Sequence, residues 1–191
     1  MDSFQPVELT TDRLTIRCLG EADIPAFFDI FSNPEVMRYW SCPPLTEIAR
    51  AEELVNEILD GYRTGRSLQV GIQRSSDRVL IGTCTLLHFN HQCRRAEIGY
   101  ALGKPYWGKG FMGEALQSFI DYAFVTLDLR RLEADIDPRN AASAKTLERL
   151  GFQKEGLLRE RWVVDGEISD TSFYGLLKSD WMQRQPTIPR S

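Results

Sequence analysis

Length, composition and charge exclude several classes of protein. The chain has 191 residues, 42% of them hydrophobic and 26% charged, which is typical of one soluble globular domain. Its formal net charge of −4, without a long run of either sign, argues against a nucleic-acid-binding protein with a basic face. The sequence shows neither a secretion signal nor an apolar run of the roughly 20 residues that cross a bilayer. We therefore expect a cytoplasmic protein that binds no nucleic acid or membrane, with a single domain at 1–191, its core at about 9–181 and a loose tail at 182–191.

The first half of the chain shows the period of a strand and then that of helices. Polar and apolar side chains alternate at 14–18, as in a half-buried strand. The next apolar residues recur at helical spacing as far as Asn33-Pro34, and a second apolar stripe runs between Thr46 and Gly65. In chain order we predict a strand at 14–18, helices from 21 to the stop at Asn33-Pro34 and between Thr46 and Gly65, and strands at 68–73, 79–89 and 96–102.

The second half changes period repeatedly, as in a domain that alternates helices and strands. One helical pattern follows Gly110, and another is closed by Gly151. The predicted elements are a helix after Gly110, a strand at 131–136, a helix ending before Gly151, and strands at 155–164 and 171–178 joined by a turn at 165–167. This order predicts one α/β domain with a mixed sheet of about seven strands and flanking helices.

The stretch GKPYWGKG, residues 103–110, nearly matches the phosphate-binding loop of nucleotide hydrolases. Gly110 stands where that loop has the Ser or Thr that ligates Mg²⁺, which disfavours a Walker-type ATPase. A glycine-rich turn before a helix still offers unpaired backbone N–H groups and the positive end of the helix dipole to a phosphate. Gly108, Gly110 and Gly113 permit close approach of a ligand, and Lys109 adds a charge. The pattern indicates either a site for a pyrophosphate that is not hydrolysed or a plain glycine-rich turn before a core helix.

Several segments together resemble one known family. The GNAT superfamily of N-acetyltransferases contains, in the same order, segments similar to LTTDRLTIRCL, SNPEVMRYW, AEIGYALGKPYWGKGFMGEAL and IDPRNAASAKTLERLGF. Within it the chain is most similar to the RimJ/RimL-like branch, the ribosomal-protein N-terminal acetyltransferases, and the resemblance covers about 9–181. It implies the GNAT fold, in which two central strands splay apart in a V that receives the pantetheine arm of acetyl-CoA.

The resemblance also assigns a ligand to the glycine-rich loop. The family pattern is Q/R-x-x-G-x-G/A; here Trp107 takes the first position, Gly110 matches, and Met112 takes the last, which contributes mainly its backbone N–H. The resemblance thus implies that the loop binds the pyrophosphate of acetyl-CoA, the acetyl donor. The implied cofactor-binding residues are Tyr100, Leu102, Trp107, Gly108, Lys109, Gly110, Phe111, Met112, Gly113, Asn140 and Ser143.

Acetyl transfer to an amine needs a base, because a free alkyl amine with a pKa of about 10 is mostly protonated at neutral pH. Glu97 begins the strand that leads to the loop, and it is similar in position to a strand glutamate that serves as base in several family members. Its neighbour Ile98 predicts a partly apolar setting, which favours the neutral form of a carboxyl group. The alternatives are a solvated residue at the end of the strand or an ion-pair partner for Arg94 or Arg95.

The departing CoA thiolate needs a proton, and Ser143 is the predicted acid. Asn140 and Ser143 are similar to the N-x-x-S of the branch, in which Asn contacts the pantetheine arm and the hydroxyl lies near the thioester sulfur. Alternatively, Asn140 is the N-cap of a plain helix start, and Tyr100 or Tyr106 is the acid. A strand backbone N–H would polarise the carbonyl oxygen of the thioester.

The cysteines and histidines suggest other chemistry, which we do not predict. His88, His91 and Cys93 have a spacing that suggests a metal site, but no fourth ligand is evident at useful spacing. The four cysteines include no C-x-x-C pair, so we expect reduced thiols. Direct transfer needs no covalent intermediate, so we expect Cys84 and Cys93 to have packing roles.

We predict an acetyl-CoA-dependent N-acetyltransferase that acts by direct transfer in a ternary complex, as a monomer or homodimer. The acceptor is a primary amine, which by analogy with the branch is the N-terminal α-amine of a ribosomal or other protein. Tyr39 and Trp40 are predicted either to edge the acceptor pocket or to pack in the core. One alternative is an acetyltransferase of a small amine such as a polyamine or aminoglycoside, which an acidic pocket would favour. The other is a non-catalytic CoA-binding sensor.

Overall fold

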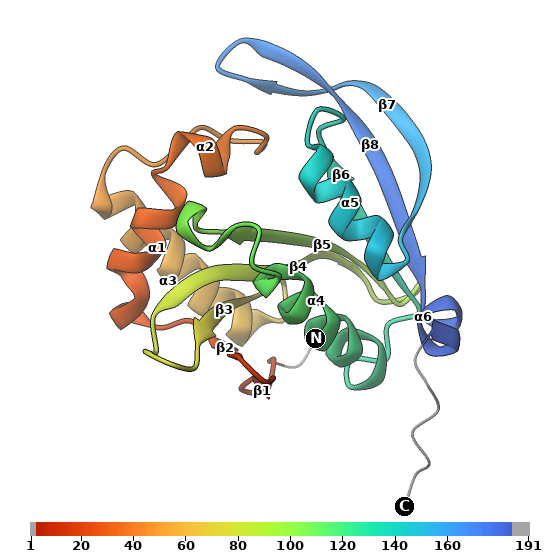
Figure 1. Cartoon of the computed structure of the whole chain (residues 1–191), viewed down its shortest axis with the longest axis horizontal. Helices are drawn as coiled ribbons and strands as arrows, with labels where there is room; N and C mark the ends of the chain where they lie inside the picture. Colours follow the sequence, from red (N-terminus) through yellow and green to blue (C-terminus); the bar gives the residue numbers. More distant parts are fainter. Residues whose placement is uncertain (1–2, 185–191) are drawn as a thin grey trace, which may run out of the picture.

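An eight-stranded sheet forms the centre of the part of the chain that the computed structural model describes, residues 3–184 (Figure 1). Neighbouring strands follow the order β1-β2-β3-β4-β5-β6-β8-β7, and within these residues only β5 and β6 run parallel to each other. The strands are β1 (Glu8–Thr10), β2 (Leu14–Cys18), β3 (Leu68–Arg74), β4 (Leu80–Asn90), β5 (Arg95–Leu102), β6 (Arg131–Ile136), β7 (Gln153–Val164) and β8 (Glu167–Leu177).

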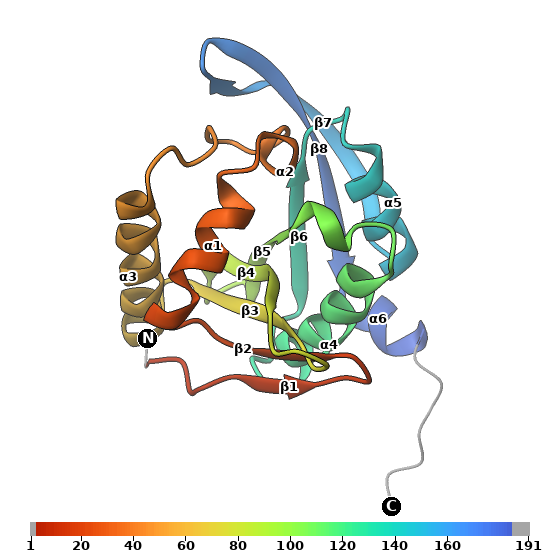
Figure 2. The same cartoon turned by 60° about the vertical axis from the view of Figure 1, so that its left-hand side comes forward.

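Helices cover both faces of this sheet (Figure 2). Helices α1 and α3 lie on one face, and α4 and α5 lie on the other. The helical elements are η1 (Glu21–Asp23), α1 (Ile24–Phe31), α2 (Pro34–Met37), α3 (Ile48–Thr64), η2 (Lys104–Tyr106), α4 (Phe111–Val125), α5 (Ala141–Leu150) and α6 (Lys178–Arg184). The predicted α/β fold with a mixed sheet and flanking helices is confirmed, with one strand more than the expected seven.

The predicted helix ends before Asn33-Pro34, as expected, and Asn33 also begins a new helix. The side-chain oxygen of Asn33 accepts hydrogen bonds from the backbone N–H groups of Glu35 (2.9 Å) and Val36 (3.4 Å) and so caps this new helix, α2. Pro34 occupies the first turn of α2, where its missing N–H costs no hydrogen bond. This break turns the chain after α1 and brings the segment that follows α2 over the sheet (Figure 1).

Two apolar clusters hold the helices on the sheet. On the α4 and α5 face, Phe119, Phe124 and Leu147 are fully buried. On the α1 and α3 face, Phe27 and Val55 are buried in a separate cluster. Each large apolar side chain that is removed from water contributes about 1.5–3 kcal/mol, so these clusters fix the central strands between the two helical layers.

The two parallel strands separate after a short contact. Their pairing runs from Arg95, opposite Arg131, to Glu97, opposite Glu133, and then ends. Beyond Glu97, β5 pairs with β4 as far as Leu102, and β6 continues beside β8. Within residues 3–184, the edges of β5 and β6 that face each other past this point therefore have no strand partner, which is the V-shaped splay that the resemblance implies.

The structure differs from the sequence prediction at both ends of the chain. Strand β1 (Glu8–Thr10) is missing from the prediction, because its three residues are too few to show an alternating pattern. Helix α6 extends through Arg184, so the prediction of a loose tail at 182–191 is wrong for 182–184, and 185–191 lie outside the described residues. Among residues 3–184, no helix is both long enough and apolar enough to cross a membrane.

The cysteines divide into buried and exposed thiols. Cys84 on β4 is fully buried in the core, as predicted for a packing residue. Cys93 lies exposed in the turn between β4 and β5, so its predicted packing role is wrong. The reason is that the polar turn projects from the sheet and offers no core for the side chain to enter.

Candidate functional site

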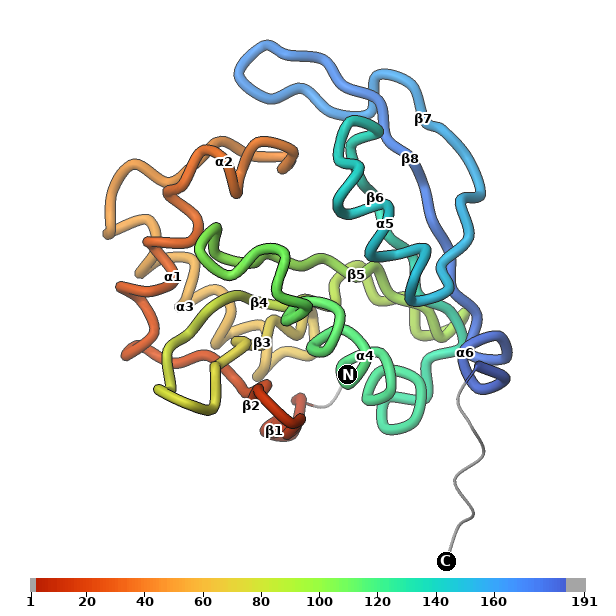
Figure 3. Tube along the Cα trace, viewed as in Figure 1, coloured from red at the N-terminus to blue at the C-terminus, as the bar shows by residue number. Residues whose placement is uncertain are grey.

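A pocket of about 660 Å³ lies at the splay between β5 and β6. Its walls come from five parts of the chain that are far apart in sequence: α2 with the segment after it, the end of β4, the middle of β5, the stretch from the end of β6 to the first turn of α5, and the β7–β8 hairpin. Figure 3 shows the tip of this hairpin arching toward the segment after α2. Tyr39 and Trp40 both line the pocket, and Trp40 also packs edge-on against Phe31 at a ring distance of 5.4 Å.

Glu97 lies at the point where the splay begins. It lines the pocket with a half-buried side chain that is 23% exposed, and its Oε2 is 3.0 Å from Nδ1 of His88. The alternative ion pairs have other partners: Arg94 bonds Asp128, and Arg95 bonds Glu133. Glu97 therefore presents a carboxylate to the pocket that neither arginine neutralises.

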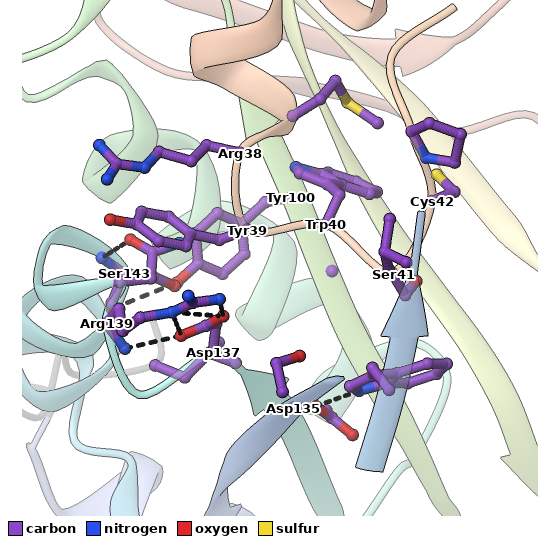
Figure 4. A pocket seen from close by; sticks show the side chains of 18 of the residues that line it. Arg38, Tyr39, Trp40, Ser41, Cys42, Tyr100, Asp135, Asp137, Arg139 and Ser143 are labelled. Atoms are coloured by element: carbon purple, nitrogen blue, oxygen red, sulfur yellow. Dashed lines mark hydrogen bonds and ion pairs between the residues drawn. The ribbon is translucent and has the colours of Figure 1, made fainter. Parts of the chain in front are cut away.

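Tyr100 and Ser143 form a hydroxyl pair in the wall of the same pocket (Figure 4). Their oxygens are 2.6 Å apart, and the Tyr100 hydroxyl also lies 3.4 Å from the Ser143 carbonyl oxygen. Burial raises the pKa of Tyr100, which keeps its hydroxyl protonated and available as a donor. Asn140 caps α5, because its side-chain oxygen accepts a hydrogen bond of 3.1 Å from the Ser143 backbone N–H. Ser143 therefore lines the pocket and also belongs to a helix start that Asn140 caps.

The glycine-rich loop ends in an exposed helix N-terminus. Gly108 and Gly110 have φ angles of 72° and 80°, in the left-handed region that favours glycine. Gly110 is the N-cap of α4 and offers no side-chain cap. The N–H groups of the first turn, at Phe111, Met112 and Gly113, have no acceptor within the helix, which makes this end suitable for phosphate oxygens.

Two predicted loop residues have structural partners. The indole N–H of Trp107 donates to the carbonyl of Leu102 at 2.6 Å and so braces the loop against the end of β5. The ammonium of Lys109 donates to the carbonyl of Pro105 at 2.8 Å. Neither side chain depends on a ligand to hold its position, whereas the first backbone amides of α4 have no side-chain cap.

Sequence reasoning missed Arg13, which comes from the turn between β1 and β2. Its Nη1 donates to the carbonyl of Lys109 at 3.0 Å, and its Nε donates to Oε2 of Glu114 at 2.6 Å. Glu114, in the first turn of α4, also accepts bonds from the Thr11 hydroxyl (2.5 Å) and the Arg13 N–H (3.0 Å). No local signal marks this contact, because its partners lie about a hundred residues apart in the sequence.

Carboxylates outnumber basic groups in the pocket. Arg139 pairs with Asp137 at 2.6 Å and also with Glu167. Burial opposes the ionisation of Asp137, but its hydrogen bonds with Arg139 outweigh burial and lower the pKa of Asp137. Besides Arg38 and Arg139, the charged residues that line the pocket are the five acids Glu97, Asp135, Asp137, Asp165 and Glu167.

Asp135 is an acid with a buried side chain in the wall of the pocket. Its side chain is only 6% exposed, and Oδ1 accepts hydrogen bonds from the Thr171 hydroxyl (2.6 Å) and the Trp162 indole N–H (3.2 Å; Figure 4). Its Oδ2 is 3.6 Å from Nε of Arg161. The two donors on Oδ1 fix the carboxylate at the wall of the pocket.

The histidines near the pocket have partners other than a metal. His88 bonds Glu97, and His91 stacks on Phe89 with a ring distance of 5.9 Å. In the described part of the chain, no group of three or more His, Cys, Asp or Glu residues is arranged to hold a metal ion.

Comparison with known proteins identifies relatives along almost the whole chain. The family model described as acetyltransferase (GNAT) domain matches residues 13–153. The uncharacterized N-acetyltransferase p20 of Bacillus licheniformis is 39% identical, over 91% of this chain and 97% of that protein. The [ribosomal protein uS5]-alanine N-acetyltransferase of Escherichia coli is 30% identical, over 92% and 93%. A crystal structure of spermidine N-acetyltransferase from Vibrio cholerae in complex with CoA and spermine has a TM-score of 0.81 and 25% identity, over 90% of this chain and 99% of that one.

Proposed function

Since this chain belongs to the GNAT acetyltransferase family, whose enzymes transfer the acetyl group of acetyl-CoA to an amine, we propose that Glu97, Tyr100 and Ser143 perform this transfer in the pocket at the splay. The observation that carries the proposal is that a carboxylate and a hydroxyl pair line one pocket. Side chains at 97 and 100 point to opposite faces of β5. Both line the same pocket, and in the described part of the chain β5 has no neighbouring strand on its β6 side past Glu97.

Each step of the transfer has a group in place. The Glu97 carboxylate takes a proton from the acceptor amine, whose nitrogen then attacks the thioester carbonyl. The new C–N bond forms as the C–S bond breaks, and Ser143, hydrogen-bonded to Tyr100, supplies the proton that the thiolate needs. Solvent then returns a proton to Ser143 and takes the one held by Glu97, so the net change moves one proton from the amine to the thiol. A backbone N–H on the open edge of β5 polarises the carbonyl oxygen, a contribution of about 3 kcal/mol for each such donor. No covalent intermediate on the protein is required.

The arrangement of β5, α4 and α5 suits acetyl-CoA. The pantetheine arm fits the splay, where the open edge of β5 leaves backbone groups unpaired, and the pyrophosphate fits the uncapped N-terminus of α4. The chain contributes backbone groups of Tyr100 and Leu102, the loop and helix start at 107–113, and the side chains of Asn140 and Ser143.

Two classes of acceptor are proposed for the pocket. The N-terminal α-amine of a ribosomal or other protein is supported by the uS5-alanine N-acetyltransferase relative and would place the chain in the RimJ/RimL-like branch. A small amine with more than one positive charge is supported by the acidic lining, because its five acids still outnumber the three arginines that line the pocket or pair with these acids, Arg38, Arg139 and Arg161. The spermidine N-acetyltransferase of Vibrio cholerae, whose structure contains CoA and spermine, is an enzyme of similar fold that binds such an amine. The electrostatics of this pocket favour the small cationic amine.

The test combines binding and turnover. Calorimetric titration with acetyl-CoA, CoA and ATP measures cofactor binding, and release of free thiol is followed with peptides that have free N-termini, polyamines and aminoglycosides. We expect binding of acetyl-CoA and CoA but not ATP, and thiol release with polyamines or aminoglycosides above that with peptides. The Glu97→Gln variant should bind acetyl-CoA as before and lose turnover. Binding of acetyl-CoA without thiol release from any amine would contradict the proposal and support a sensor.

A further inference from the structure

His88 occupies an irregular position in β4. The register pairs Leu87 with Glu97 and Asn90 with Arg95, so His88 and Phe89 together oppose a single residue of β5. The φ angle of His88 is 51°, in the left-handed region that side chains other than glycine rarely adopt. Strained residues of this kind persist where the surrounding structure holds them, and they concentrate at functional sites.

The bulge changes the direction of the His88 ring. In a regular strand, successive side chains point to opposite faces, so His88 would point away from the face that carries Leu87 and Glu97. Instead Nδ1 of His88 lies 3.0 Å from Oε2 of Glu97 and the ring lines the pocket. β-Bulges are common next to active sites, where they redirect a side chain.

The carboxylate next to Glu97 has its own partners: Glu133 is the register neighbour of Glu97 on β6, and it is bonded to both Arg95 and Arg131. In the tautomer that carries its proton on Nδ1, His88 donates to Oε2 of Glu97, because a carboxylate only accepts hydrogen bonds. This bond fixes one carboxylate oxygen and leaves Oε1 for the proton of the acceptor amine.

We propose that His88 is a positioning residue that orients Glu97 for proton removal from the acceptor, and that the strained bulge in β4 exists to place its ring there. The proposal rests on the proposed role of Glu97 as base. His88 itself touches neither acetyl group nor thiol in this assignment. Its side chain is 68% exposed, so its contribution to folding is small and its contribution to the orientation of Glu97 is the one to measure.

The decisive experiment compares stability and turnover in matched variants. The His88→Gly variant removes the strain and the hydrogen bond, so its melting temperature should be equal or higher while kcat falls about 10-fold or more and the KM for acetyl-CoA stays unchanged. The His88→Asn variant tolerates the left-handed conformation and places an amide N–H near the position of Nδ1, so it should recover kcat to within about threefold. Arg78, with a φ of 61° in the turn before β4, is the control: Arg78→Gly should match the gain in stability without a change in kcat.

The Glu97→Gln variant separates the proposed role of His88 from the proposed role of Glu97 as base. If Glu97→Gln keeps the kcat of the native enzyme, the assignment of Glu97 as base fails, and the role of His88 fails with it. If Glu97→Gln loses turnover but His88→Gly does not, only the role of His88 is overturned. The expected result is that His88→Gly causes no further loss in the Glu97→Gln background. An equal loss in both backgrounds, or a melting temperature of His88→Gly well below that of the native protein without rescue by His88→Asn, would also overturn the proposal.

Discussion

The hydroxyl oxygens of Tyr100 and Ser143 lie 2.6 Å apart, one on the open part of β5 and the other in the first turn of α5. The pair joins the open part of β5 to the helix that follows β6, the other strand of the splay. Because burial raises the pKa of Tyr100, that hydroxyl remains protonated and orients the hydroxyl of Ser143.

Removal of the Ser143 hydroxyl should slow the transfer. We expect Ser143→Ala to lower kcat about 100-fold, the lower range for loss of a general acid, and to leave the KM for acetyl-CoA within a few-fold. Tyr100→Phe should have a smaller effect, because the serine remains. Steady-state kinetics with thiol detection check both expectations. The control is Thr146→Ala, which removes another hydroxyl of α5, bonded to the carbonyl of Ala142, and should change neither kcat nor KM. A full loss in Tyr100→Phe with none in Ser143→Ala would make Tyr100 the acid.

The ion pair between Arg13 and Glu114 should affect acetyl-CoA binding alone. Arg13 holds the carbonyl of Lys109 in the loop before α4 and lies over the Phe111 ring at 4.5 Å, so Arg13→Met loosens the proposed pyrophosphate site. We expect the KM for acetyl-CoA to rise about 10-fold, equivalent to about 1.4 kcal/mol, with kcat and the KM for the amine nearly unchanged. The control is Arg66→Met, an exposed arginine paired with Asp60 at the end of α3. An effect confined to kcat would show that the ion pair acts elsewhere than on the cofactor.

Local chemistry explains which features the sequence predicts. The helix after Gly110 and the cap at Asn140 depend on neighbouring residues, and both appear as expected. The break at Asn33 was visible too, although its role as the cap of a new helix was not. Short-range patterns therefore predict the elements and the loops that end at the site.

Contacts between distant segments explain what the sequence does not predict. The bond between Arg13 and Glu114 joins the first turn of the chain to a helix in its second half. The turn of His88 toward Glu97 depends on a bulge, and a strand pattern that assumes alternation places that ring on the wrong face. Asp135 reads as an ordinary strand residue, and only the packing of the β7–β8 hairpin encloses it.

The acidic lining should make the acceptor KM depend on acceptor charge. Asp135→Asn removes a charge but keeps an oxygen for the Trp162 and Thr171 donors, so the wall of the pocket should retain its shape. We expect the KM for a diamine to rise about 10-fold and that for a monoamine of similar length to rise much less. Higher salt should reduce the difference between the two amines, since screening weakens the attraction. An equal rise for both amines would indicate a change of shape, and Asp60→Asn on the surface of α3 is the control for charge alone.

The ion pair between Arg17 and Asp23 should contribute to stability in a pH-dependent way. Asp23, with a side chain only 9% exposed, accepts two bonds of 2.8 Å from Arg17 and one of 2.9 Å from the Gly20 N–H. Burial opposes its ionisation, but these bonds outweigh burial and lower the pKa of Asp23. The stabilisation is therefore complete above the ordinary aspartate pKa and is lost as pH falls through the lowered value.

We expect Asp23→Asn to reduce the free energy of unfolding by about 2 kcal/mol at neutral pH and by less near pH 3, measured by urea titration. The exposed pair of Asp77 with Arg74 offers the control Asp77→Asn, which should change stability much less at either pH. A loss for Asp23→Asn that is as large near pH 3 as at neutral pH would mean that packing, and not the charge of Asp23, stabilises this turn.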